Sequence, residues 1–95
     1  MRLRKEEIEI IKTTVGKHLP ATDVYLFGSR VDDSKRGGDI DILIIGAEDE
    51  DRSALREIRI ELKDRLGDQK IDLLYEQQRA MTAFGKLAKL EGAQL

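Results

Sequence analysis

Apolar residues recur along this chain with two different periods, and the period in each segment predicts a helix or a strand. Near the N-terminus the apolar positions are three or four residues apart: Ile8, Ile11, Val15 and Leu19. This spacing places them on one face of a helix over Arg4–His18. Pro20 ends that helix, because proline has no backbone N–H with which to continue it.

Three shorter apolar segments have the length and composition of strands. They are Asp23–Phe27, Asp39–Ile45 and Lys70–Tyr75. Gly28 bounds the first of them, and residues 30–38 are expected to form one helical turn and then a loop. The chain therefore supplies three strands for a sheet.

A second helix is expected between the second and third strands. Ser53 is a suitable N-cap for it, and Gly67 is a suitable end. Its predicted buried face comprises Leu55, Ile58, Leu62 and Leu66.

The last predicted helix covers Arg79–Leu90 and ends at Gly92. Its expected buried residues are Met81, Phe84 and Ala88. Helices thus alternate with three strands, an order that predicts a single α+β, two-layer domain over residues 1–95. The three-stranded mixed sheet would be covered mainly on one face by helices, and the other face would be open.

Composition and charge narrow the class of partner. Of 95 residues, 40% are hydrophobic and 38% are charged, the formal net charge is −2 and the pI is about 5.4. This balance gives no overall basic field, which argues against a long nucleic acid as substrate. The lack of cysteine excludes disulfides and thiolate metal sites. No segment has the pattern of a membrane span or a signal peptide, so we expect a cytoplasmic protein without membrane contact.

Two aspartates begin the second predicted strand, and a third lies within the third strand. Residues two apart on a strand point to the same face, so Asp39 and Asp41 project together, about 7 Å apart at the backbone. If these strands are neighbours, Asp72 stands about 5 Å across from Asp41. Three unpaired carboxylates this close repel one another, and a hard divalent cation such as Mg²⁺ or Mn²⁺ relieves the repulsion. The pattern therefore predicts a metal site.

The turn after the first strand has features that suit phosphate binding. Gly28 lacks a Cβ, so a triphosphate can approach the backbone closely. Ser29 adds a hydroxyl and a backbone N–H, and Arg30 is the best-placed nearby cation. An Asp-x-Asp or a Gly-Ser turn alone also fits ordinary surface structure. Their combination with a matched third acid favours a metal–nucleotide site.

The same residues resemble the sequence signature of the DNA polymerase β-like nucleotidyltransferase superfamily, in Gly28-Ser29, Asp39-Ile40-Asp41 and Asp72. The Gly-Ser-Arg form and the small size are most similar to its minimal nucleotidyltransferases, the MNT or MntA-type antitoxins. The resemblance implies a polymerase β-like palm fold, ATP as substrate and two Mg²⁺ ions, with Mn²⁺ as an alternative. The catalytic and metal-binding residues that it implies are Asp39, Asp41 and Asp72. The nucleotide-binding residues that follow from the turn and the resemblance are Gly28, Ser29 and Arg30.

The resemblance also implies a reaction and a partner. A hydroxyl would attack the α-phosphorus of a nucleoside triphosphate and release pyrophosphate, while Asp72 helps to deprotonate the hydroxyl. Members of the minimal group often act as antitoxins paired with a HEPN-domain ribonuclease toxin, which implies transfer of AMP to a toxin tyrosine. Two other functions stay open. One is a binding module that neutralises its partner by occlusion alone, and the other is a transferase that acts on RNA or a small metabolite.

Some residues outside this site bear on partner surfaces. Four apolar residues lie off the predicted buried faces and together permit a docking surface: Leu3, Ile10, Ile60 and Leu90. His18 is expected to be a solvated residue at a helix C-terminus, and Tyr25 and Tyr75 are expected in the core.

Overall fold

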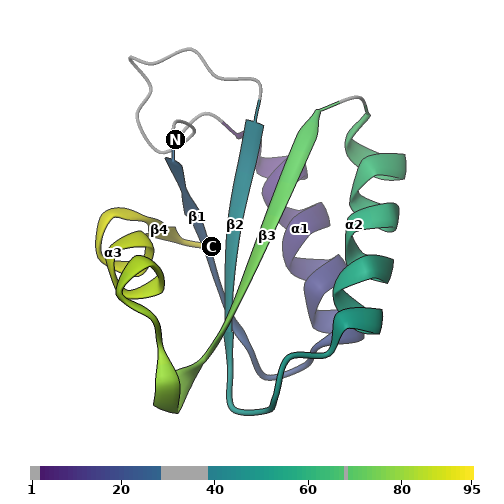
Figure 1. Cartoon of the computed structure of the whole chain (residues 1–95). Coiled ribbons are helices and arrows are strands. Elements are labelled where there is room, and N and C mark those ends of the chain that lie inside the picture. Colours follow the sequence, from purple (N-terminus) through teal and green to yellow (C-terminus); the bar gives the residue numbers. More distant parts are fainter. Residues whose placement is uncertain (1–2, 29–38, 68) are drawn as a thin grey trace.

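The computed structural model of the chain describes residues 3–28, 39–67 and 69–95. A mixed sheet forms its centre, with helices on both faces (Figure 1). The helices are α1 (Lys5–His18), α2 (Arg52–Leu66), the 3₁₀ helix η2 (Gln78–Ala80) and α3 (Ala83–Glu91). The strands are β1 (Asp23–Phe27), β2 (Asp39–Gly46), β3 (Lys70–Gln77) and β4 (Ala93–Gln94).

The sheet has the strand order β3-β2-β1-β4. The central strand β2 is parallel to β3 and antiparallel to β1, which confirms the predicted mixed sheet. The fourth strand, β4, was not predicted, because two residues are too few to show a strand period. It pairs antiparallel with the outer side of β1, and the backbone N–H of Leu95 donates to the carbonyl of Val24 at 2.9 Å.

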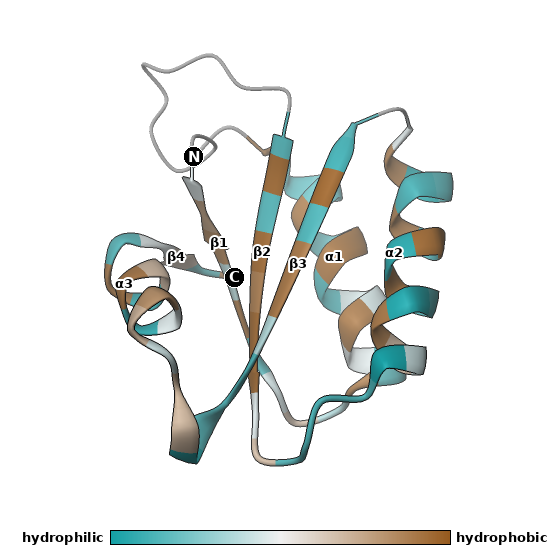
Figure 2. Ribbon diagram, in the orientation of Figure 1, coloured by the Kyte–Doolittle hydropathy of each residue, from teal (hydrophilic) through white to brown (hydrophobic). Residues whose placement is uncertain are grey.

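Helices α1 and α2 lie side by side on one face of the sheet (Figure 1). Their apolar stripes pack on alternate residues of the strands, and bands of opposite hydropathy accordingly follow one another along the first halves of β2 and β3 in Figure 2. The residues of this core that are entirely shielded from solvent include Ile11, Val15, Leu26, Ile40, Ile42, Ile44, Ile58 and Leu62. The predicted buried faces of both helices are therefore confirmed.

Helix α3 lies on the opposite face and forms a second, smaller core with Leu43, Ile45 and Ala88. The prediction for this helix was wrong in two respects. It begins at Ala83 rather than Arg79, and Phe84 is 60% exposed instead of buried. The cause is local capping.

The buried Glu76 carboxylate accepts the backbone N–H of Thr82 at 2.6 Å and the Thr82 hydroxyl at 3.0 Å. The Thr82 hydroxyl then accepts the N–H of Gly85, which fixes the helix start. With this start, Gly85 and Ala88 face the sheet, and Met81 lies ahead of the helix, partly buried.

Several smaller expectations also need correction. The N-cap of α2 is Asp51, whose side chain accepts the N–H of Ala54 at 3.0 Å, and not Ser53. Leu3 is buried and Ile10 packs on the larger core, so neither contributes to an exposed surface. His18 is half-buried, with its Nε2 3.3 Å from a carboxylate oxygen of Glu61 on α2.

Candidate active site

The pairing of β2 with β3 brings the three predicted acids to one end of one sheet face. In the parallel register, Asp41 lies opposite Asp72, and Asp39 lies opposite Lys70. The intervening residues Ile40 and Ile71 are buried in the core under α1 and α2. Because side chains alternate between faces along a strand, all three acids project from the face opposite α1 and α2. The expected juxtaposition of Asp41 and Asp72 is confirmed.

Burial and two neighbouring acids perturb the environment of Asp41. Partial burial raises the pKa of the Asp41 carboxyl above its ordinary value, and the negative charges of Asp72 and Asp39 raise it further. The Asp72 carboxylate also shares a hydrogen bond with it, and among the described residues the Lys70 ammonium acts in the opposite direction. Removing carboxylates from water and placing them together costs free energy, and such an arrangement is typical of a functional site.

Gly28 lies directly against Asp41. It follows β1, whose last residue Phe27 pairs with Asp41 across the sheet. The backbone of Gly28 has φ +79°, a conformation that residues with a Cβ adopt rarely. A Cβ at this position would overlap a carboxylate oxygen of Asp41 and would lie 3.1 Å from its Cγ. The backbone conformation and the neighbouring acid therefore both favour glycine here.

The donor set of this site suits a hard divalent cation. Asp39, Asp41 and Asp72 offer only carboxylate oxygens, the ligand type that Mg²⁺ and Mn²⁺ prefer. Within the described residues, no three acidic or histidine side chains stand as a ready-made metal-binding group. The role of the three acids as metal ligands accordingly stays a prediction, which their common face and mutual repulsion support.

Part of the predicted nucleotide site lies outside the described residues. Ser29, Arg30 and the helical turn expected within residues 30–38 all belong to this part of the chain. Gly28 is thus the one residue of the predicted phosphate-binding turn whose geometry is given by the structure.

Sequence reasoning overlooked Lys70. This residue lies opposite Asp39, and it shares a sheet face with Asp72 because the two are two residues apart on β3. Its positive charge lowers the pKa of Asp41. The same alternation rule that grouped the acids places this cation with them. The prediction treated Lys70 only as the start of a strand.

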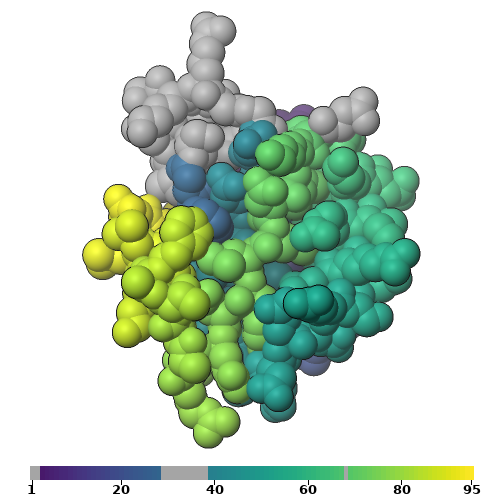
Figure 3. All heavy atoms as spheres, in the orientation of Figure 1, coloured from purple at the N-terminus to yellow at the C-terminus, as the bar shows by residue number. Residues whose placement is uncertain are grey.

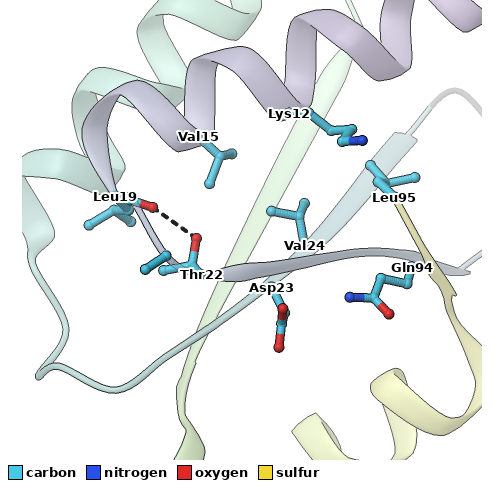
Figure 4. A pocket seen from close by; sticks show the side chains of 10 residues that line it. Lys12, Val15, Leu19, Thr22, Asp23, Val24, Gln94 and Leu95 are labelled. Carbon is cyan, nitrogen blue, oxygen red and sulfur yellow. Dashed lines mark hydrogen bonds between the residues drawn. The ribbon is translucent and has the colours of Figure 1, made fainter.

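A pocket elsewhere on the molecule is separate from the acids. It has a volume of about 180 Å³ and lies between α1, β1 and the C-terminal residues (Figure 4). Its wall includes Lys12, Val15 and Leu95, and the Leu19 carbonyl at its end accepts the Thr22 hydroxyl at 2.9 Å. The pocket borders the start of β1, whereas the acids lie near the end of that strand.

The fold and the acid cluster together define the nucleotidyltransferase class of α+β domain. The sequence matches the family described as "Polymerase beta, Nucleotidyltransferase" over residues 9–93. The chain belongs to this family. No curated protein sequence matches it closely enough to count as a relative. Among the described residues, no helix is long and apolar enough to cross a membrane.

Solved structures from toxin–antitoxin pairs share the fold. A variant of the MntA–HpeT pair matches with a TM-score of 0.69 and 26% identity over 98% of this chain and 71% of that one. A toxin–antitoxin structure with AMP-PNP matches with a TM-score of 0.72 and 25% identity over 97% of this chain and 72% of that one.

A third structure contains a modified toxin. It is a complex of the tri-AMPylated Shewanella oneidensis HEPN toxin with MNT antitoxin, and it matches with a TM-score of 0.65 and 29% identity. The match covers 93% of this chain and 66% of that one. This chain is therefore shorter than the chains it resembles.

Proposed function

We propose that this protein transfers AMP from ATP to a hydroxyl of a partner protein, and that the partner is a HEPN-type toxin which the modification silences. The single observation that carries the proposal is the register that sets Asp41 opposite Asp72, on the same face as Asp39. The match to the polymerase beta nucleotidyltransferase family over most of the chain supports the reaction type.

The nucleotide would lie over the end of the sheet that carries the acids. Gly28 lets the triphosphate approach the backbone, and Ser29 and Arg30 supply donors and positive charge to its oxygens. Lys70 adds a second cation at the same edge. Asp39, Asp41 and Asp72 would hold two Mg²⁺ ions, or Mn²⁺. Such ions neutralise charge on the phosphate oxygens when bound.

The reaction itself is a substitution at phosphorus. The acceptor oxygen forms a bond to the α-phosphorus, and the bond from that phosphorus to the bridging oxygen of the β-phosphate breaks. Pyrophosphate leaves with that electron pair, and the hydroxyl proton passes to the Asp72 carboxylate and then to water. Beyond this proton transfer, the protein contributes orientation and charge.

The comparisons support the choice of partner. The similar structures come from toxin–antitoxin pairs, one of which contains an AMPylated HEPN toxin and another AMP-PNP. By this likeness, the acceptor is a tyrosine hydroxyl of a HEPN protein encoded beside this chain. A cytoplasmic location, expected from the sequence, belongs to the same proposal.

Intact-mass spectrometry tests the transfer. The chain is incubated with ATP, Mg²⁺ and the HEPN protein encoded beside it, and the HEPN protein is expected to gain the mass of one or more AMP groups. Asp41→Asn should abolish the gain, because it removes a charge from the centre of the acid cluster. Asp64→Asn is the matched control, since Asp64 is exposed on α2, on the other side of the sheet. A wild-type reaction without added mass contradicts the proposal.

Occlusion without chemistry is the competing function, and the exposed apolar residues of α3 favour it, because they suit a partner interface. The double variant Asp39→Asn/Asp41→Asn separates the two functions. Transfer predicts that this variant still binds the HEPN protein but no longer inhibits its ribonuclease activity. Full inhibition by the double variant would establish occlusion.

A further inference from the structure

The exposed large apolar side chains of the described residues are concentrated on one helix. They are Ile60 on α2, at 53% exposure, and Phe84, Leu87 and Leu90 on α3, at 60%, 51% and 81%. Residues three apart on a helix are neighbours on its surface. The three residues of α3 therefore form a continuous stripe, which we call the α3 stripe.

The way α3 rests on the sheet leaves this stripe outside. The helix contacts the strands through small residues, Gly85 and Ala88. A Cβ on Gly85 would overlap the Glu76 side chain. The space between α3 and the sheet therefore has no room for the larger side chains of the helix, which stay on its outer face. In Figure 1, α3 stands on the side of the sheet away from α1 and α2, and in Figure 3 its atoms form part of the visible surface at the left. Half or more of the surface of each large side chain therefore stays exposed in the described fold.

One end of the stripe connects it to the acid cluster. The ring of Phe84 packs edge-to-face against the ring of Phe27, with centroids 6.0 Å apart. Phe27 pairs with Asp41 across the sheet and precedes Gly28. Phe84 at the start of the stripe is therefore separated from the cross-strand partner of Asp41 by a single ring contact.

The fold also fixes the direction from which an acceptor can arrive. Helices α1 and α2 cover the other sheet face, where the side chains of the strands pack into the larger core. A hydroxyl that reaches the α-phosphorus must therefore come over the face that carries both the acids and α3.

We propose that the α3 stripe is the docking surface for the protein acceptor, and that it places the acceptor hydroxyl over the acid cluster. This inference rests on the proposed function. The partner surface that fits it is an apolar patch on a helix, because ridges of Leu and Phe pack into the grooves of another helix. Lys86 and Lys89, which directly precede Leu87 and Leu90 on α3, would favour acidic residues at the rim of that patch.

The size of the stripe favours an acceptor over a second copy of this chain. With about 200 Å² for a fully exposed large side chain, its exposed fractions correspond to on the order of 400 Å². A stable interface needs about 800 Å² from each partner. The stripe is too small to hold a dimer alone. It is large enough to anchor a contact that continues over the nucleotide and the acid cluster.

The double variant Leu87→Asp/Leu90→Asp tests the proposal, with Ile60→Asp as the matched control on the other face. Both substitute exposed apolar residues, so circular dichroism and thermal unfolding should match the wild type. Calorimetry would measure the Kd for the HEPN protein and, separately, for ATP with Mg²⁺. Intact-mass kinetics would give kcat and KM for AMP transfer.

We expect the α3 double variant to raise both the Kd and the KM for the HEPN protein at least tenfold, with kcat at saturation and the Kd for ATP unchanged. Ile60→Asp should leave all four values within twofold of the wild type. Unchanged binding in the α3 variant, or an equal loss in Ile60→Asp, overturns the docking proposal. So does a wild-type dimer in sedimentation that the α3 variant dissociates, since a second copy would then occupy the stripe.

The binding measurement keeps this proposal separate from the proposed function. A wild type that binds the HEPN protein without adding AMP contradicts transfer, and the α3 variant still decides where binding occurs. A wild type that binds no HEPN protein contradicts both.

Discussion

The two faces of the sheet carry side chains from the same strands but have different roles. On the face under α1 and α2, Ile40 and Ile42 are fully buried in a continuous apolar core. On the other face, Asp39 and Asp41 alternate with them and stand beside Asp72. One face gains free energy by excluding water, whereas the other places like charges together at a cost. The period of two along a strand thus lets one segment stabilise the fold and hold a site.

Two carboxyl groups show the same contrast at the level of single residues. Burial acts to raise the pKa of both Glu7 on α1 and Asp41 on β2. For Glu7, the N–H of Arg4 and the amide of Gln69 donate to the carboxylate, and with the Arg4 charge they bring its pKa below the ordinary value. For Asp41, burial is joined by the charges of Asp72 and Asp39, the carboxylates beside it among the described residues, and its pKa is raised. A buried carboxylate that accepts hydrogen bonds has a structural role. A carboxylate that lies beside other carboxylates indicates a functional site.

The largest effect on stability is expected from the apolar face. Ile58→Ala removes a side chain with 0% exposure from the core under α2, and it should lower the free energy of unfolding by about 3 kcal/mol. Ile60→Ala, two residues away and 53% exposed, should change it by less than about 0.5 kcal/mol. Urea unfolding measures both. Similar losses in the two variants would mean that the core does not lie where the structure places it.

Gly28→Ala should affect both the stability of the fold and the rate of AMP transfer. The positive φ alone costs about 1 kcal/mol in a residue with a Cβ. The added methyl also overlaps the Asp41 carboxylate, so we expect a total loss of about 2 kcal/mol and roughly tenfold slower AMP transfer.

Gly67→Ala is the control for this variant. Gly67 has φ +82°, and nothing lies within 4 Å of its added Cβ. It should therefore show the conformational cost with unchanged transfer. Equal transfer rates in the two variants would show that Gly28 does not position Asp41.

Much of the fold could be predicted from the sequence, because the spacing of apolar residues indicates which side chains are buried. The bounds of β1 followed from its short apolar run and the glycine after it, and the residue opposite Asp72 was predicted on the condition that β2 and β3 are neighbours. The failures concern side-chain hydrogen bonds, which the hydrophobic pattern does not show. Glu76 holds Thr82 and sets the start of α3, and no local pattern shows that a glutamate six residues earlier will do so. As a result, the burial of Phe84 was predicted wrongly.

The site could be predicted less completely than the fold. Alternation grouped the three acids, because it depends only on strand direction and register. Lys70 obeys the same rule and was missed, since a lysine at a strand end is also common as a solvated residue. Its effect on Asp41 depends on its placement beside Asp39, which only the register shows.

Glu7→Gln tests the structural carboxylate through pH. Because the folded-state pKa of Glu7 is lowered, its contribution to stability is present above the ordinary glutamate pKa of about 4.3 and is lost as pH falls through the folded value. The variant should be about 1 kcal/mol less stable than the wild type at pH 7. That difference should shrink in acid, as urea unfolding at several pH values would show. A difference independent of pH would assign the loss to packing instead.

Asp41→Asn should have the smallest effect on the free energy of unfolding. In contrast to Glu7→Gln, it should raise that free energy. The raised pKa means that the folded state binds the Asp41 proton more tightly than the unfolded state. The wild type therefore loses stability as pH rises from the ordinary value of 3.8 toward the raised one, and the variant does not. Because Asp41 is half-exposed and screened by water, the gain at pH 7 in EDTA should stay below about 1 kcal/mol. Adding Mg²⁺ should reverse the order, since a cation that binds only the folded wild type stabilises it. A variant less stable than the wild type in EDTA would mean that the Asp41 carboxylate stabilises the fold, as the Glu7 carboxylate does.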